Sequence, residues 1–347
     1  MSVRGDDDRA NERLDAYLRE RPLVLNIETT NICNALCCFC AYPKLKRGKH
    51  EMTEELYAKI VRDYAEMGGG ALILTPIVGD FFLDSQWKER LRVARSNPSI
   101  GMISVTTNAI ALSEAADDDL RFYLVHTDFT QISLGGTTSE TYFSMFGVDQ
   151  FEAAVAGARR LAKLRNQIRP SYPLRVGFRV ADAAATEASP LTHELLGLGF
   201  EVAIESEFGN WGGSVRADEL PVGALLRRPK SWREKRNPCF VFFLGLFVAS
   251  SGKVTVCGCM DANVDEVIGD CNSQNLADIW KGQVYREIKK SFGTPEMPSI
   301  CKRCSFYEDG VEFSRSPEMV NFVPGRYPFT SGGTLSMFER RDVKRKR

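Results

Sequence analysis

Residues 23–40 read LVLNIETTNICNALCCFC, an apolar segment that runs directly into four cysteines within eight positions. The apolar and β-branched content of Leu23–Thr30 is typical of a buried strand. After it, Cys33, Cys37 and Cys40 follow a C-x3-C-x2-C spacing. Three thiolates on one short loop can ligate three irons of a [4Fe–4S] cluster and leave the fourth iron open, as a catalytic metal site requires. Structural zinc favours two separated C-x2-C pairs, so we predict an iron–sulfur cluster here.

Downstream of this loop the chain alternates strand-like and helix-like segments. Further strands are expected at 71–77, 101–108, 129–134, 174–180 and 200–205, and helices at 54–67, 84–95, 113–125, 151–164 and 191–198. Regular alternation of strand and helix predicts an α/β fold with a parallel sheet or barrel. In such folds the reactive groups lie on loops at the carboxyl ends of the strands, which is where the cysteine loop falls.

Composition argues against several classes of protein. The 347 residues carry 45 Lys+Arg and 45 Asp+Glu, and this zero net charge gives no electrostatic reason for a nucleic-acid or anionic-membrane partner. The longest strongly apolar run, residues 240–249, is about half of what a membrane-spanning helix needs. No signal-peptide pattern follows Met1, so the ten cysteines are expected to be reduced thiols in a cytoplasmic protein.

A second group of cysteines follows a cysteine-free stretch from 41 to 238. Cys239 and Cys257 bracket an expected hairpin, and Cys301 and Cys304 form a C-x2-C turn. Four thiolates in this arrangement would close a [4Fe–4S] site fully, so its expected work is electron transfer. The alternative is a structural zinc ion held by the same four cysteines. Between the two pairs we expect a strand at 253–256 and a helix through 276–292.

On these residues the chain resembles the radical S-adenosylmethionine (SAM) superfamily. The C-x3-C-x2-C motif after the first strand carries the resemblance, together with the aromatic Phe39 before its last cysteine. The resemblance implies a partial (β/α)6 TIM-like barrel in which SAM binds the open iron. It also implies reductive cleavage of SAM to a 5′-deoxyadenosyl radical that abstracts a substrate hydrogen atom, with a flavodoxin- or ferredoxin-type electron donor.

The same resemblance implies where SAM is held. Gly79 and Asp80 occupy the place of a Gly-Gly-Glu motif whose backbone carbonyls bind the SAM amino group, and the different side chains here leave such a contact intact. Asn108 and Ser133, at the ends of the third and fourth strands, stand where family members contact SAM. Arg179 on the fifth strand would suit the SAM carboxylate, which a guanidinium binds with two hydrogen bonds.

The second cysteine group resembles the auxiliary-cluster domain of the sulfatase-maturase-like (SPASM) radical SAM enzymes. Cys239, Gly252 and Cys257 match its opening pattern, but Gly310 replaces a later cysteine and no cysteine follows Cys304. The truncated form, called a twitch domain, holds one auxiliary [4Fe–4S] cluster. The expected organisation is an N-terminal extension (1–22), a radical SAM barrel (23–215), a linker (216–238), an α+β SPASM/twitch domain (239–310) and a C-terminal extension with a basic tail (311–347).

Three cysteines remain outside these seven ligands. Cys38 is expected to pack in the cluster loop, and Cys259 could replace Cys257 as a ligand. Cys271 could be a small buried residue, the common fate of a free cysteine. Alternatively, Cys259 or Cys271 donates a hydrogen atom to a substrate radical, as a radical epimerase needs.

For the reaction, we expect oxidation or epimerisation of a carbinol carbon in a small polar metabolite. The single auxiliary cluster resembles enzymes that act on aminocyclitols and sugars in antibiotic biosynthesis. Glu205 and Glu207, after the sixth strand, could act as a base or as an anchor for an ammonium group. Only 22 residues precede the barrel, too few for the winged-helix module that many peptide-modifying relatives use.

Other functions stay open at this stage. The first is a maturase that oxidises or cross-links a ribosomally made peptide. The second, from a different class, is a non-catalytic iron–sulfur electron carrier or zinc-binding module. Molybdopterin-type cyclisation is disfavoured because the tail ends in Lys344–Arg347 rather than in the paired glycines of that family.

Overall fold

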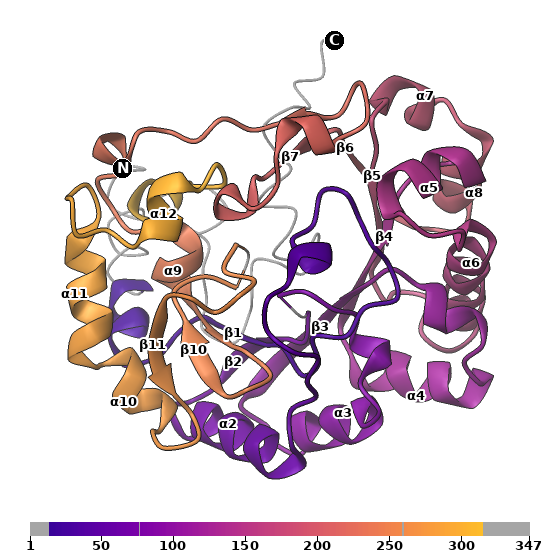
Figure 1. Ribbon diagram of the computed structural model, residues 1–347. Helices are drawn as coiled ribbons and strands as arrows, with labels where there is room; N and C mark the ends of the chain where they lie inside the picture. Colours follow the sequence, from indigo (N-terminus) through magenta and orange to yellow (C-terminus); the bar gives the residue numbers. More distant parts are fainter. Residues whose placement is uncertain (1–13, 76, 259, 315–347) are drawn as a thin grey trace, which may run out of the picture.

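The computed structural model describes residues 14–75, 77–258 and 260–314 (Figure 1). Within them one sheet runs in the order β11-β10-β9-β1-β2-β3-β4-β5-β6. Its strands β1 to β6 pair in parallel, each with the next. Their bounds are β1 Val24–Ile27, β2 Gly70–Ile73, β3 Ile100–Thr107, β4 Phe129–Leu134, β5 Leu174–Arg179 and β6 Glu201–Glu205. This topology confirms the predicted α/β class and partial (β/α)6 barrel.

Helices connect these strands and form a layer around the outside of the sheet (Figure 1). They are α2 Glu54–Glu66, α3 Trp87–Arg95, α4 Asp117–His126, α5 Ser139–Phe146, α6 Phe151–Ile168, α7 Ala183–Glu187 and α8 Pro190–Gly197. Side chains alternate between the two faces of each strand. Leu25, Ile103 and Ile132 on the helix-facing side are fully buried, so the residues between them point to the inside of the barrel.

Some expected helix bounds are wrong, and the local sequence explains why. Two helices begin later than expected because 3-10 turns precede them, η2 Phe81–Leu83 before α3 and η3 Ile110–Ser113 before α4. The helix expected through 276–292 is two helices, α10 Leu276–Trp280 and α11 Gln283–Ser291. The break falls at Gly282, whose extended backbone forms the N-cap of α11. The sequence analysis also missed α5, which starts at a capping box between Thr138 and Thr141.

The C-terminal unit extends the barrel sheet. The apolar run at 240–249 forms a short helix, α9 Phe240–Leu244, and then β9 Gly245–Val248. Strand β9 pairs in parallel with β1, and β10 Lys253–Thr255 and β11 Val267–Asp270 continue the sheet in antiparallel order. The unit ends with α12 Ser299–Arg303 and α13 Gly310–Ser314. Because backbone hydrogen bonds join β9 to β1, the two cysteine groups are fixed on one framework.

Short elements lie between the barrel and this unit. They are β7 Glu207–Phe208, η4 Trp211–Gly213, η5 Ala217–Glu219, β8 Leu225–Leu226 and η6 Trp232–Glu234, and η1 Tyr42–Lys44 follows the first cysteine loop. The expected linker at 216–238 therefore contains several turns and a strand. The basic tail lies outside the described residues. In the part of the chain that the structure describes, no helix has both the length and the apolar character to cross a membrane.

Candidate functional site

The first cysteine loop leaves β1 and lies against the C-terminal end of α5. The amide N–H of Leu36 donates to the carbonyl of Phe146 at 2.9 Å, and that of Cys38 donates to the carbonyl of Met145 at 3.0 Å. Gly147 at this helix end has φ of 67°, and a Cβ there would lie 2.6 Å from the Leu36 carbonyl. Glycine is therefore required for the loop to approach the helix this closely.

The loop gathers the three thiols of the C-x3-C-x2-C motif. Burial raises the pKa of Cys33 to about 12, with the nearby Asp80 carboxylate adding to the effect. Burial also raises the pKa of Cys37, and the neighbouring Cys40 and Cys33 raise it further. The thiols therefore lie close enough to repel one another as thiolates, and bound iron would relieve that repulsion while releasing their protons. This donor set fits an iron–sulfur cluster.

The loop after β2 brings the predicted SAM-binding residues to Cys33. Gly79 has φ of 129°, and a Cβ there would lie 2.8 Å from the Thr30 carbonyl. The buried Asp80 carboxylate accepts a hydrogen bond from the Asn108 N–H at 2.7 Å, as well as from the Thr107 hydroxyl. The Asn108 amide in turn donates to Asn34 Oδ1 at 2.7 Å and to Cys33 Sγ at 3.9 Å. Gly79, Asp80 and Asn108 thus lie together beside the first cysteine site.

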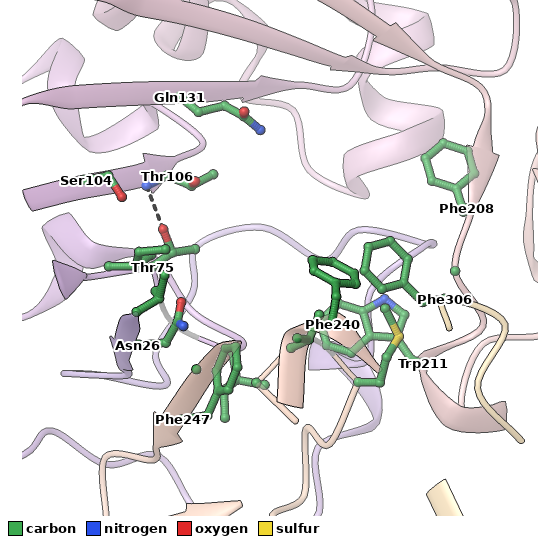
Figure 2. A pocket seen from close by; sticks show the side chains of 18 of the residues that line it. Asn26, Thr75, Ser104, Thr106, Gln131, Phe208, Trp211, Phe240, Phe247 and Phe306 are labelled. Carbon is green, nitrogen blue, oxygen red and sulfur yellow. Dashed lines mark hydrogen bonds between the residues drawn. The ribbon is translucent and has the colours of Figure 1, made fainter. Parts of the chain in front are cut away.

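The barrel encloses a cavity of about 300 Å³ with two unlike ends (Figure 2). One end carries aromatic side chains, and the other carries small polar side chains from neighbouring strands. The aromatic end is lined by Phe39, Phe208, Trp211, Phe240 and Phe306. The polar end is lined by Asn26, Thr75, Ser104, Thr106 and Gln131. Ser133 on β4 does not line this cavity.

Gln131 stands out at the polar end. Its side chain is fully buried, and both its amide nitrogen and its amide oxygen lack a hydrogen-bond partner. Figure 2 shows this amide pointing into the cavity, across from Thr75 and Thr106. A buried amide without partners is costly, so the cavity offers a binding site for a group that can both donate and accept. The sequence analysis missed this residue, although its position between the outward-facing Thr130 and Ile132 carries the signal.

Two ion pairs lie on the cavity wall between the ends. Arg179 and Glu205 face each other in the register of β5 and β6 and form an ion pair. Arg227 Nε and Glu207 Oε2 are 3.3 Å apart. Arg179, predicted for the SAM carboxylate, thus contacts a carboxylate of this chain. Both predicted glutamates line the cavity.

The aromatic end joins the first cysteine loop to the cavity. The Phe39 ring stacks on the Phe208 ring with centroids 4.9 Å apart. The indole N–H of Trp211 donates to the Phe39 carbonyl at 2.7 Å. The residue next to Cys40 is therefore held by a segment far along the chain, and the cysteine loop borders the cavity.

Glu28, which the sequence analysis missed, ties both cysteine regions together. Its buried carboxylate pairs with both terminal nitrogens of Arg47, just beyond the first cysteine loop, at 2.5 Å each. It also accepts hydrogen bonds from the Ser250 N–H at 3.1 Å and the Ser250 hydroxyl at 2.9 Å, at the β9–β10 turn. Arg47 Nε donates to the Ala262 carbonyl at 2.6 Å. One carboxylate at the end of β1 thus fixes the loops around both sites.

The second cysteine site is a small apolar cavity of about 20 Å³. Cys239, Cys257, Cys301 and Cys304 all line it, together with apolar side chains such as Ile300 and Phe292. The predicted C-x2-C turn is in fact helical, because Cys301 lies in α12 and Cys304 is its C-cap. Among the described residues, no three His, Cys, Asp or Glu side chains converge closely enough for a single metal ion. The four thiols surround a space instead.

The two cavities are neighbours. Val241 and Met260 line both of them. Burial raises the pKa of Cys304 to about 12 and also raises that of Cys239 and Cys301, and in each case another cysteine of the group adds to the rise. The four thiols are therefore mutual neighbours in an apolar site, a donor set that fits an auxiliary cluster beside the barrel cavity.

The remaining cysteines lie elsewhere. Cys271 is buried behind β11, its N–H donating to the Gly252 carbonyl at 2.8 Å, and it lines neither cavity. Burial raises its pKa to about 12. The structure therefore does not bring Cys271 to the other site residues. Cys259 lies outside the described residues. Cys38 is half-buried in the first loop.

Comparisons with known proteins agree with this geometry. The family model of the radical SAM superfamily matches residues 27–168, and that of an iron–sulfur cluster-binding domain, SPASM, matches residues 239–305. These ranges contain the two cysteine sites. A curated relative, the GTP 3′,8-cyclase of Cronobacter sakazakii, is 25% identical over 43% of this chain and 44% of its own length. The probable GTP 3′,8-cyclase of Thermococcus kodakarensis is 29% identical over 46% of this chain and 50% of its own. The chain thus spans about half the length of these relatives.

Solved structures share the fold. BtrN in complex with AdoMet and 2-DOIA has a TM-score of 0.52 at 16% identity, with 81% of this chain and 92% of that chain covered. Streptococcus suis SuiB bound to the precursor peptide SuiA has a TM-score of 0.58 at 13% identity, with 92% and 78% covered. The enzyme anSMEcpe with bound AdoMet has a TM-score of 0.54 at 14% identity, with 79% and 81% covered. At these identities the likeness establishes the fold alone.

Proposed function

The chain belongs to the radical SAM superfamily and carries a SPASM-type iron–sulfur cluster-binding domain, and on that premise we propose that it oxidises a carbinol carbon of a small polar metabolite. The observation that carries the proposal is the polar end of the barrel cavity. Five hydrogen-bonding side chains from neighbouring strands meet there, and the amide of Gln131 has no partner of its own. Such a surface suits a molecule with several hydroxyl or amino groups.

The cofactors of such an enzyme are a [4Fe–4S] cluster, SAM and an auxiliary cluster. We assign Cys33, Cys37 and Cys40 to the first cluster; the auxiliary cluster would be held by Cys239, Cys257, Cys301 and Cys304. When bound, these groups supply the radical that removes the substrate hydrogen atom and an acceptor for the electron that follows.

The chain itself positions the substrate and handles a proton. The amide of Gln131 and the hydroxyls of Ser104 and Thr106 would hold substrate hydroxyl or amino groups, so that one carbinol C–H bond faces the first cysteine loop. Loss of a hydrogen atom from carbon, a proton from oxygen and one electron converts the carbinol to a ketone. Glu205, held by Arg179 on the cavity wall, is the proposed proton acceptor, and Glu207, with a side chain 46% exposed, connects the wall to solvent.

We favour oxidation over epimerisation because of where the thiols lie. Epimerisation needs a hydrogen-atom donor beside the substrate, whereas Cys271 is packed away from both cavities. The auxiliary cysteine cavity, in contrast, shares Val241 and Met260 with the barrel cavity. An electron acceptor is therefore placed beside the substrate space.

The test uses the full-length protein with both clusters reconstituted under anaerobic conditions. It is incubated with SAM, a chemical reductant and polyols or aminocyclitols deuterated at their carbinol carbons. We expect mass spectrometry to find deuterium in 5′-deoxyadenosine and a matching ketone. The undeuterated compounds serve as the control. Deuterium transfer from no polyol, but from a labelled peptide, would overturn the proposal.

A peptide maturase is the second candidate, and the aromatic end of the cavity favours it. Four rings, those of Phe208, Trp211, Phe240 and Phe306, could receive an apolar or aromatic side chain. Action on GTP, the activity named for the curated relatives, fits the cavity less well. Each arginine that lines it in the described structure is paired with a glutamate, so its charge is balanced, whereas a triphosphate needs excess positive charge.

A further inference from the structure

A buried lysine braces the auxiliary cysteine site from outside. Lys235 follows η6, in the segment expected to be a linker, and its side chain is fully buried. Its ammonium donates hydrogen bonds to the carbonyls of Cys301 and Cys304, at 2.7 Å each, and to that of Lys302 at 3.3 Å. All three acceptors belong to the C-x2-C segment. One side chain thus satisfies the carbonyls at the C-terminal end of α12, which a helix leaves without partners.

The charge of this lysine needs a negative partner. A buried ammonium is costly unless an opposite charge compensates it, and none of the ion pairs among the described side chains involves Lys235. Burial lowers the pKa of Lys235, but the nearby Cys304, Cys301 and Cys239 act in the opposite direction as thiolates. The auxiliary cysteines are therefore the negative groups that face this ammonium.

We propose that Lys235 is a positioning residue of the auxiliary cluster, which orients the C-x2-C segment through its three hydrogen bonds and raises the reduction potential of the cluster through its positive charge. Four thiolates give a cluster a net negative charge, and reduction adds one more. A positive charge close by in an apolar site stabilises the reduced form more than the oxidised form. The proposal needs the auxiliary cluster but not the proposed substrate, so it can be tested without substrate.

Lys289 provides a matched control in the same unit. It is also a largely buried lysine whose pKa burial lowers. Its ammonium lies over the rings of Phe243, Trp280 and Tyr285, at 5.0 to 5.6 Å from their centroids. Asp15 is the charged group that acts on its pKa. Removing this charge should leave the auxiliary cluster unaffected.

The experiment is a redox titration of the full-length protein with both clusters, followed by electron paramagnetic resonance. The same chain with Cys33, Cys37 and Cys40 changed to Ala assigns the auxiliary signal. For Lys235→Gln we expect the equilibrium constant of one-electron reduction to fall about tenfold, which corresponds to about 59 mV. Lys235→Arg should stay within about threefold of wild type, and Lys289→Gln should not differ from it.

Each outcome decides the proposal. An auxiliary cluster with an unchanged potential in Lys235→Gln contradicts it. If Lys235→Gln fails to assemble this cluster, by iron content, then Lys235→Arg should assemble it with a near wild-type potential. Failure of Lys235→Arg as well, with the first cluster and the thermal midpoint retained, would mean that shape rather than charge matters, and this also overturns the proposal.

Discussion

The two cysteine sites are built from the same thiol chemistry but have opposite charges beside them. The first site lies on a loop at the mouth of the barrel, where the buried carboxylate of Asp80 acts on Cys33. The second is closed in an apolar cavity, where the buried ammonium of Lys235 bonds to the carbonyls of Cys301 and Cys304. The comparison teaches that identical ligands can be given different electronic surroundings by a single buried side chain each.

Removal of each thiol set should separate the roles of the sites, with the largest expected effect. With Cys33, Cys37 and Cys40 changed to Ala, SAM cleavage should fall below detection, because the open iron is lost. With Cys239 and Cys304 changed to Ala, SAM cleavage should continue while the oxidised product disappears. Chromatography of 5′-deoxyadenosine and of product measures both. Product formation without the second set would contradict the division of roles.

Gln131 lies in the cavity between the sites, and its loss should impair substrate binding. Gln131→Leu removes both hydrogen-bonding atoms at similar volume, which should lower kcat/KM for substrate by about 10- to 100-fold, equivalent to about 1–3 kcal/mol. Cluster content should not change. The control is Gln167→Leu, on the outer helix α6. A loss of cluster iron in Gln131→Leu, or an unchanged kcat/KM, would argue against a role in substrate recognition.

Asp80→Asn sharpens the electrostatic comparison. The substitution removes the negative charge near Cys33, so the equilibrium constant for reduction of the first cluster should rise about fivefold, opposite in sign to the effect of Lys235→Gln. The free energy of unfolding should fall by about 1–3 kcal/mol, because the asparagine amide faces the N–H groups that the carboxylate accepted. Redox titration and chemical denaturation measure the two effects. A shift in the same direction as for Lys235→Gln would break the comparison.

Cys271→Ala should have the smallest effect. This thiol lies outside both cavities, so SAM cleavage and product formation should stay within about twofold of wild type. The free energy of unfolding should fall by about 1 kcal/mol, because a small buried side chain is truncated. Turnover assays and denaturation check this. Loss of product with intact SAM cleavage would instead identify Cys271 as a hydrogen-atom donor.

Much of the fold could be predicted from the sequence, because strands and helices alternate clearly from β1 to β6. Short helices such as α5 and α7 could not, since they carry too few turns for a periodic pattern. The break at Gly282 shows that one residue can divide a segment with continuous helical character. The join between β9 and β1 depends on pairing between distant segments, which local sequence does not encode.

The site was predictable where residues cluster along the chain. The cysteine spacing carries the first site, and the strand ends locate Gly79 and Asn108. Gln131 and Lys235 were missed because their roles depend on distant partners. The amide of Gln131 matters because the barrel encloses it, and Lys235 matters because its ammonium meets carbonyls 66 to 69 residues away.

The most direct test of the account counts electrons at the auxiliary site. Full-length protein with both clusters, loaded with SAM, a single reducing equivalent and an aminocyclitol or polyol that gives deuterium transfer, is frozen after one turnover. Electron paramagnetic resonance then quantifies the reduced auxiliary cluster, and mass spectrometry quantifies the ketone. The account predicts one reduced auxiliary cluster for each ketone formed. Product without a reduced auxiliary cluster, or an epimer in place of the ketone, would contradict it.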